Sequence, residues 1–175
     1  AILAVRLAAL ALNRTDLFFD EAQYWTWSLE PAFGYYSKPP LIAWAIALST
    51  GLCGTSEFCI RLPSIFIHLA TSTAVYFVGL QLFSKQVGFW SAITFATLPG
   101  ISVSSGIIST DVPLLLAWAV ALLAFAELVK APSLAISLML GLALGIGLNA
   151  KYAMAYFVPC AAVFFLMAPE KSALL

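Results

Sequence analysis

A series of long apolar runs with almost no internal charge is the feature that most limits how this chain can fold. Leu62–Leu82 and Gln86–Thr110 contain no Asp, Glu, Lys or Arg, and about 20 apolar residues are enough for a helix to cross a bilayer. Hydrophobic residues fill 63% of the 175 positions and charged residues only 9%, against roughly 25% charged in a soluble domain. The sequence therefore predicts an integral membrane protein.

Six apolar runs are predicted to form membrane helices: Ile2–Leu12, Leu62–Leu82, Gln86–Thr110 with a kink at Pro99 and Gly100, Val112–Ala126 continuing to Lys130, Ala131–Ala150, and Tyr152–Ala168. We expect an all-α fold, a polytopic transmembrane bundle of about six helices. Residues 1–13 would end a first membrane helix, 14–61 would form an extracytoplasmic loop with interfacial helices, and 62–168 would form the remaining membrane helices. Because Ala1 lies inside an apolar run, we also expect the chain to be a piece of a longer protein.

Pro39–Leu52 is apolar but short. As a helix it would span about 21 Å, less than the hydrocarbon core of about 30 Å, so we predict a re-entrant or interfacial segment. The distribution of basic residues favours a spanning segment instead, because spanning would place five basic residues on one side and two on the other. Length decides the prediction, and the short basic turns around Lys85, Lys130 and Lys171 are expected in the cytoplasm.

The stretch Leu17–Leu41 does not fit the apolar pattern. Eight of the nineteen residues from Phe18 to Tyr36 are aromatic, and four of the chain's eight carboxylates lie in or beside the stretch: Asp16, Asp20, Glu21 and Glu30. Aromatic residues favour the membrane interface, so the stretch is either an interfacial anchor or an active-site loop at the membrane surface. A helix from about Leu17 to Leu29, capped by Thr15 or Asp16, would put Asp20 and Glu21 on different faces.

Other polar residues have structural and functional interpretations. Asp111 would cap the following helix, either alone or while also serving a site. Arg61 and Lys151 are boundary anchors or site residues. His68 is expected to be a core residue, and Arg6 either extends to the interface or faces a polar cavity. For Cys53 and Cys59, free thiols are preferred over a disulfide on an oxidising face.

With Pro39–Leu52 kept on the outer face, several acids and bases come to the same membrane surface: Asp20, Glu21, Lys38, Arg61, Asp111 and Lys151. Glycosyl transfer from a lipid phosphate fits this set. The leaving phosphate needs positive charge, and the acceptor hydroxyl needs a positioned base. Asp20 can supply the base, and Lys38, Arg61 and Lys151 can pair with phosphate oxygens. A transporter or permease fragment with a polar outer-face cavity is the alternative.

An ordered set of segments resembles the polyprenyl-phosphate-dependent GT-C glycosyltransferases, the group of the protein mannosyltransferases and the bacterial lipid A aminoarabinose and galacturonic acid transferases. The segments are DEAQYWTW, GYYSKPPLIAWAIALSTGL, EFCIRLPS, STDVPLLLAWAVAL and GLALGIGLNAKYAMAYFVP. The resemblance covers nearly the whole chain and implies a multi-pass bacterial inner-membrane enzyme with its active site facing the periplasm. The implied partners are a polyprenyl-phosphate sugar donor, a lipid or glycan acceptor and the lipid bilayer. The zero net charge gives no reason to expect nucleic acid.

The resemblance also implies roles for residues. Asp20 would be the general base, with Glu21 beside it and Asp111 shaping the same cavity; Lys38 and Lys151 would hold the donor phosphate. Members similar to the aminoarabinose transferases carry a metal-binding carboxylate just before the first lysine, where this chain has Ser37. The sequence therefore predicts no certain cofactor and leaves open whether a divalent metal takes part.

Overall fold

The computed structural model describes residues 1–167, and within that range the chain is all α-helical. It contains nine α-helices and one 3₁₀ helix, and no strand. The elements are α1 (Ile2–Leu12), α2 (Phe19–Ser28), α3 (Leu41–Cys53), α4 (Glu57–Leu82), α5 (Lys85–Thr97), α6 (Pro99–Ser104), α7 (Asp111–Lys130), α8 (Leu134–Ala150), η1 (Tyr152–Tyr156) and α9 (Phe157–Met167). The predicted basic turn at Lys171 and the last residue of the predicted final span lie outside the described residues.

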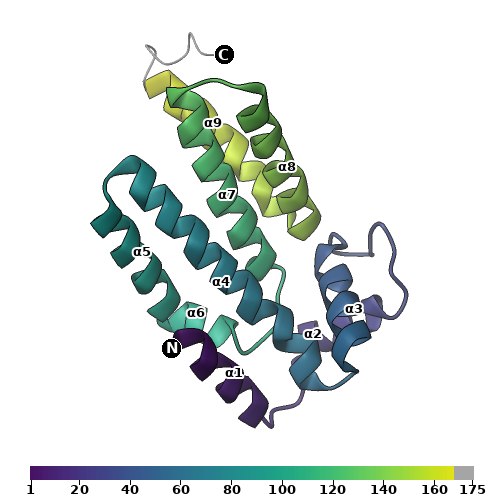
Figure 1. Cartoon of the computed structure of the whole chain (residues 1–175). Coiled ribbons are helices and arrows are strands. Elements are labelled where there is room, and N and C mark those ends of the chain that lie inside the picture. The colour runs from purple at the N-terminus through teal and green to yellow at the C-terminus, as the bar shows by residue number, and fades with distance from the viewer. Residues whose placement is uncertain (168–175) are drawn as a thin grey trace.

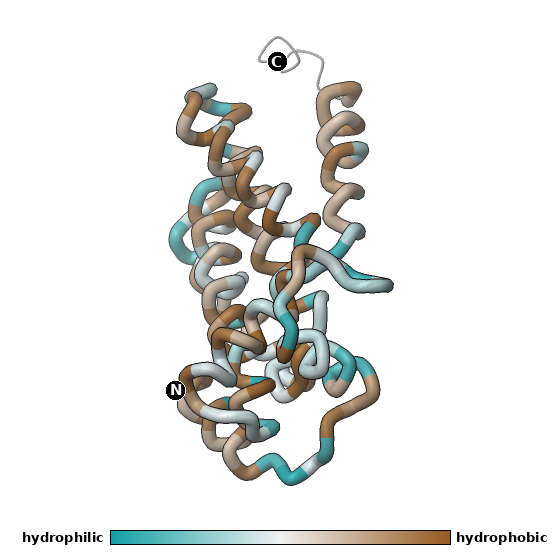
Figure 2. The backbone as a smooth tube through the Cα atoms, turned by 90° about the vertical axis from the view of Figure 1, so that its right-hand side faces the viewer, coloured by the Kyte–Doolittle hydropathy of each residue, from teal (hydrophilic) through white to brown (hydrophobic). Residues whose placement is uncertain are grey.

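Two helices are long and apolar enough to cross a membrane, α4 with 26 residues and α7 with 20 residues. The other apolar helices are shorter, α3 among them at 13 residues. In Figure 1 the α4–α5 and α7–α8 turns lie at the end of the bundle opposite α2 and α3. Hydrophobic residues predominate along the upright helices, and hydrophilic segments gather toward the end that carries α2 and α3 (Figure 2).

Helix α4 is the centre of the packing, because α1, α3, α5 and α7 all lie against it. It meets α5 at two glycines, where a Cβ on Gly79 would come within 2.7 Å of the Gly88 Cα. At the opposite end from α2, the Gln81 amide donates to Glu127, and the Lys130 Nζ donates to the Gln81 carbonyl at 2.7 Å. These contacts join α4 to α7 and hold α7 in place, and α7 carries Asp111 as its first residue.

The helix predicted over Gln86–Thr110 is interrupted, not merely kinked, at Pro99. Pro99 has no N–H to continue the hydrogen-bond ladder of α5, and after α6 residues 105–110 are not helical. Arg6 donates to the Ala96 carbonyl at 2.6 Å, near the end of α5, and lines a cavity of about 360 Å³ with His68 and Ser72. Arg6 thus faces a cavity, as one of the two interpretations has it, but the lining of that cavity is mostly apolar.

Helix α2 begins two residues later than predicted, and neither Thr15 nor Asp16 caps it. The Glu21 carboxylate turns back and accepts from the Phe18 N–H at 3.0 Å, so the helix start is capped from within by an acidic residue of its first turn. Helix α4 begins at Glu57 instead of Leu62, with the Ser56 hydroxyl accepting from the Cys59 N–H. The predicted boundary between loop and membrane helix at residues 61 and 62 therefore falls inside one continuous helix.

The preference for free thiols at Cys53 and Cys59 is also wrong. The two residues form a disulfide, because α3 ends and α4 begins with their Cα atoms 5.9 Å apart, which is within the range that a disulfide can bridge. Cys59 is buried, and its carbonyl accepts from the Ser49 hydroxyl at 2.6 Å. The disulfide thus joins α3 directly to the first turn of α4.

Candidate active site

The first part of the candidate site is an acid, a phenol and a lysine at the end of the bundle that carries α2. Asp20 lies in the first turn of α2 with its side chain 62% exposed, and its Oδ2 is 4.0 Å from the Lys38 Nζ. Lys38 precedes the Pro39–Pro40 pair that opens α3, and its Nζ donates to the Tyr24 hydroxyl at 2.6 Å. Tyr24 is buried, so Lys38 is held by a fixed partner and Asp20 stays open to solvent.

The second part is an ion pair between two segments forty residues apart. Asp111 is the first residue of α7, and its Oδ1 accepts from the Lys151 Nζ at 2.6 Å, with both side chains about half exposed. Lys151 ends α8 in an extended conformation. Neither Thr110 nor Asp111 caps α7 through its side chain, so the predicted cap is wrong and the Asp111 carboxylate instead pairs with Lys151.

The two parts lie near each other, because the charge of Asp111 as well as that of Asp20 acts on Lys38. We call the four residues together the acid–base row: Asp20, Lys38, Asp111 and Lys151. The hydrogen bond to Tyr24 is the largest cause that raises the pKa of Lys38 above its ordinary value, and the charges of Asp20 and Asp111 add to it. Lys38 therefore stays protonated throughout the neutral range. A row of two fixed ammonium groups and two carboxylates can bind an anionic group and accept a proton beside it.

Glu21 and Arg61, two further predicted site residues, lie beneath the acid–base row. Their side chains are 2% and 1% exposed, and the pair is bidentate, with Arg61 Nε to Glu21 Oε1 at 2.9 Å and Nη2 to Oε2 at 2.8 Å. Arg61 also donates to the Thr15 carbonyl and hydroxyl and to the Asp16 carbonyl. A guanidinium has five N–H donors, and these five contacts occupy them all.

A small hydrophobic cluster supports the acid–base row from below. Its buried members are Tyr24, Ile42, Ile46, Ile60 and Ile108, and they come from α2, α3, α4 and the segment before α7. The aromatic residues of the loop complete it, with Trp27 packed against the cluster and stacked on Tyr35 at 4.8 Å between ring centroids. Packing beneath the site thus accounts for Tyr24, Trp25, Trp27 and Tyr35, whereas the other four aromatic residues from Phe18 to Tyr36 are exposed.

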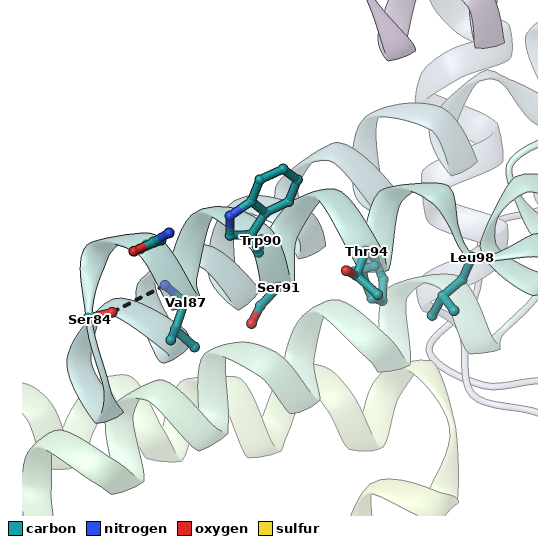
Figure 3. A pocket seen from close by; sticks show the side chains of 8 residues that line it. Ser84, Val87, Trp90, Ser91, Thr94 and Leu98 are labelled. Carbon is teal, nitrogen blue, oxygen red and sulfur yellow. Dashed lines mark hydrogen bonds between the residues drawn. The ribbon is translucent and has the colours of Figure 1, made fainter.

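An apolar groove of about 400 Å³ begins next to the acid–base row. Its lining comes from α3, α4, α7 and α8 and includes Leu41, three residues after Lys38, and Pro113, two residues after Asp111. A second hollow, shown in Figure 3, lies along α5 between Ser84 and Leu98 and takes no part in the row. An apolar groove with charged residues only a few positions away in the chain suits an amphipathic molecule with an anionic head.

The acid–base row offers little to a metal ion. Within residues 1–167, no group of three or more His, Cys, Asp or Glu is placed to hold one. Asp20 and Asp111 each lie beside a lysine ammonium, which competes with a cation for the carboxylate oxygens. The donor set therefore does not fit a divalent metal bound by this part of the chain.

Two features of the site were not predicted. Tyr24 lies one helical turn after Asp20, and only the structure shows that its hydroxyl accepts from the Lys38 Nζ. The Ile108 N–H donates to Glu21 Oε1 at 2.8 Å, and no pattern in the sequence indicates this contact between a backbone amide and a carboxylate 87 residues away. His68, as expected, is a core residue, buried with its Nε2 3.0 Å from the Ser104 hydroxyl.

Comparison with known proteins identifies a family and similar sequences. The lipid A galacturonosyltransferase RgtD of Rhizobium johnstonii is 40% identical over 165 residues, which cover 94% of this chain and 35% of that protein. An uncharacterized protein of Aquifex aeolicus is 37% identical over 60 residues, 34% of this chain and 14% of that protein. No solved structure matches the chain. Residues 37–175 match the family described as dolichyl-phosphate-mannose-protein mannosyltransferase, and the chain therefore belongs to that family.

Proposed function

We propose that this chain is the catalytic membrane portion of a glycosyltransferase that moves a sugar from a polyprenyl-phosphate donor to a lipid or other acceptor on the periplasmic face of the bacterial inner membrane. The observation that carries the proposal is the acid–base row beside the apolar groove. Membership of the family and the similarity to a lipid A galacturonosyltransferase support it. They also favour a lipid A-type acceptor.

The proposed division of roles follows from exposure and pairing. Lys38 and Lys151 bind the donor phosphate, because each presents an ammonium at the surface beside the groove. Asp20, the most exposed carboxylate of the row, is the general base. Asp111 holds Lys151 in place and borders the same space. Arg61 was predicted to bind phosphate, but it has no free donor. Glu21 was predicted to assist catalysis, but it has no exposed surface. The proposal therefore gives neither residue a direct contact with substrate.

The proposed reaction is a single displacement with inversion. The acceptor oxygen attacks the anomeric carbon as its proton passes to the Asp20 carboxylate. The bond between that carbon and the phosphate oxygen breaks, and the electron pair leaves with the polyprenyl phosphate. Lys38 and Lys151 stabilise the charge that develops on the leaving phosphate. Electrostatic stabilisation of this kind is usually the largest single contribution to catalysis. The prenyl chain would lie in the apolar groove, which is lined almost wholly by carbon.

We further propose that α1, α4, the α5–α6 pair, α7, α8 and α9 make up a GT-C type bundle of about six membrane helices, with α2 and α3 at the interface. A helix of 13 residues such as α3 is about 20 Å long and falls short of the hydrocarbon core. The Cys53–Cys59 disulfide supports an oxidising compartment at this end.

The transporter alternative has less support. It needs ionisable groups near the midplane of the helices. The two candidates, Arg6 and His68, are accounted for by structure: Arg6 binds the carbonyl left free at the break after α5, and His68 binds Ser104.

Substitution of Asp20 by Asn tests the base assignment in the complete protein. D20N keeps the size of the side chain but cannot take up a proton, so we expect transfer to fall by at least about 100-fold, a typical contribution of general base catalysis. The matched control is E30Q, because Glu30 is an exposed carboxylate of the same loop that lies outside the row. The measurement is transfer of labelled sugar from donor to lipid acceptor in membranes, with protein amount quantified by immunoblot. Full activity of D20N would disprove the assignment.

A further inference from the structure

The buried Glu21–Arg61 pair has no exposed surface on which to contact a substrate. It nevertheless contacts α2, which carries Asp20, and the segment that leads to Asp111. Glu21 accepts from four donors: the Phe18 N–H, the Ile108 N–H and two nitrogens of Arg61. Arg61 in turn binds the backbone carbonyls of Thr15 and Asp16. The pair therefore joins the segment before α2, α2 itself, α4 and the non-helical segment between α6 and α7.

Two of these connections end next to the acid–base row. Glu21 is adjacent to Asp20 in the first turn of α2, and Ile108 lies three residues before Asp111. The segment between α6 and α7 has no helical hydrogen bonds of its own over residues 107–109. Its position relative to α2 therefore depends on the side chains that reach it, chiefly Glu21 to Ile108 and Ser64 to the Ile107 carbonyl at 2.6 Å.

We infer that Glu21 and Arg61 are positioning residues that fix the distance between the two halves of the site, Asp20 with Lys38 and Asp111 with Lys151. This inference rests on the proposed function. The base comes from one half, and each half supplies one of the two phosphate-binding ammonium groups. Transfer therefore requires both halves at a fixed separation, since misplacement of a catalytic group by 1 Å can cost about 100-fold in rate.

The chemistry of the pair fits positioning better than either direct binding or stability alone. Direct phosphate binding requires a free N–H, and the five contacts of Arg61 occupy all five. A buried ion pair contributes little net stability compared with apolar residues of the same volume, but it specifies geometry when every donor and acceptor is used. Here the fork of Arg61 matches one carboxylate and two carbonyls, which neither a lysine nor an apolar side chain can do.

Steady-state kinetics of R61K and E21Q in the complete protein distinguish positioning from donor binding. R61K keeps the charge but loses the fork, and E21Q keeps the shape but loses the charge. For both we expect kcat to fall by about 100-fold and the KM for the donor to stay within about threefold. The double variant E21Q/R61K should be no slower than the slower single variant, because the two residues act as one unit. The matched control is S49A, which removes a buried hydrogen bond between α3 and α4 without touching the pair and should keep kcat within about threefold.

A distance measurement gives a readout that does not depend on activity. Spin labels at Thr26 in α2 and Ser109 before α7, in a C160S background, report the separation of the two halves by pulsed electron resonance. We expect a narrow distribution in the parent and S49A proteins, and a broadened or shifted one in E21Q and R61K. If no protein transfers sugar, the proposed function fails, and this measurement still decides whether the pair holds the two halves together.

Two outcomes would overturn the inference. The first is a donor KM raised at least tenfold by R61K with kcat unchanged, which would mean that Arg61 contacts the phosphate. The second is a loss of activity in E21Q and R61K with an unchanged distance distribution. If R61K does not accumulate in membranes, E21Q supplies both measurements.

Discussion

Asp20 and Glu21 are neighbours in the chain, but the structure gives them opposite environments. The Asp20 side chain is 62% exposed beside Lys38, whereas Glu21 is 2% exposed and saturated by four donors. The cause is the helix itself, since successive residues point about 100° apart around its axis. One residue therefore faces the solvent and the other faces α4, which allows a reactive group to be adjacent to the group that holds it in place.

The raised pKa of Lys38 depends chiefly on one buried phenol, Tyr24, and this makes its pH dependence testable. The bond from Lys38 Nζ to Tyr24 is the largest cause of its raised pKa. A raised pKa means that the contact favours the folded state fully below the ordinary lysine value of about 10.4, and that this contribution is lost as the pH rises through the raised value.

Replacing Tyr24 by Phe removes that hydroxyl, so the pKa of Lys38 should fall. We expect the alkaline limb of kcat/KM for the donor in Y24F to move to lower pH than in the parent protein, with the plateau at pH 7 reduced less than tenfold. Transfer assays between pH 7 and 10.5 measure the limb. Y35F is the control, because Tyr35 donates to backbone carbonyls and does not contact Lys38. Superimposable limbs for Y24F and the parent would contradict the assignment.

At the scale of the elements, the site depends on helix ends more than on helix bodies. Asp20 and Asp111 lie in the first turns of α2 and α7, and Lys151 lies just past the end of α8. A carboxylate near a helix N-terminus is stabilised by the helix dipole. Breaks in the helices, caused by prolines and by extended residues such as Leu98, bring these ends to one surface.

The Cys53–Cys59 disulfide holds one such end in place, the first turn of α4, and Arg61 follows in the next turn. In the chain-entropy picture a crosslink that closes so short a loop contributes about 2 kcal/mol. We therefore expect the variant C53S/C59S, or the parent treated with reductant, to unfold at a lower temperature than the oxidised parent. Thermal unfolding of the purified protein in detergent measures the shift, and C160S serves as the control because Cys160 is free and exposed.

The same crosslink reports on which side of the membrane the site lies. In a C160S background, the exposed Cys53 thiol should, after reduction, react with a maleimide that cannot cross the membrane when it is added to the periplasmic side. Labelling only after the membrane is permeabilised would contradict the proposed topology.

At the scale of the whole molecule, charge and apolar surface meet at one place. The acid–base row lies where α3, α7 and α8 come together, and the groove extends from it between α3, α4, α7 and α8. The chain spans 35% of the length of its galacturonosyltransferase relative, so the activity of the whole protein is tested on the complete protein in each experiment.

Filling the groove should impair use of long-chain donors selectively. Ala45 of α3 lines it, and a phenylalanine there would occupy space proposed for the prenyl chain. We expect A45F to raise the KM for a donor with a full-length prenyl chain at least fivefold, and to leave the KM for a donor with a short chain within twofold. A47F, on the same helix but outside the lining, is the control. Equal effects on both donors would argue against the groove as the prenyl site.

The sequence by itself determined the class of the protein and the location of its chemistry. Long uncharged runs determine membrane helices because nothing else satisfies the backbone in lipid, and the bounds of α1 and α7 follow closely from them. The polar residues stranded among those runs, including Asp20, Lys38, Asp111 and Lys151, are few enough to be recognised individually. Their grouping at one end was predicted, and the structure pairs Asp20 with Lys38 and Asp111 with Lys151.

Only the tertiary structure decided which charges face the solvent and which lie inside. Nothing in the local sequence distinguishes Arg61 from Lys151 as a surface cation, because burial depends on segments brought from elsewhere: Thr15, Glu21 and Ile108 meet around residue 61 only after α2, α4 and the segment before α7 have packed together. Hydropathy depends on composition and is local, whereas the pairing of charges depends on three-dimensional proximity, and that physical difference separates what could be predicted from what could not.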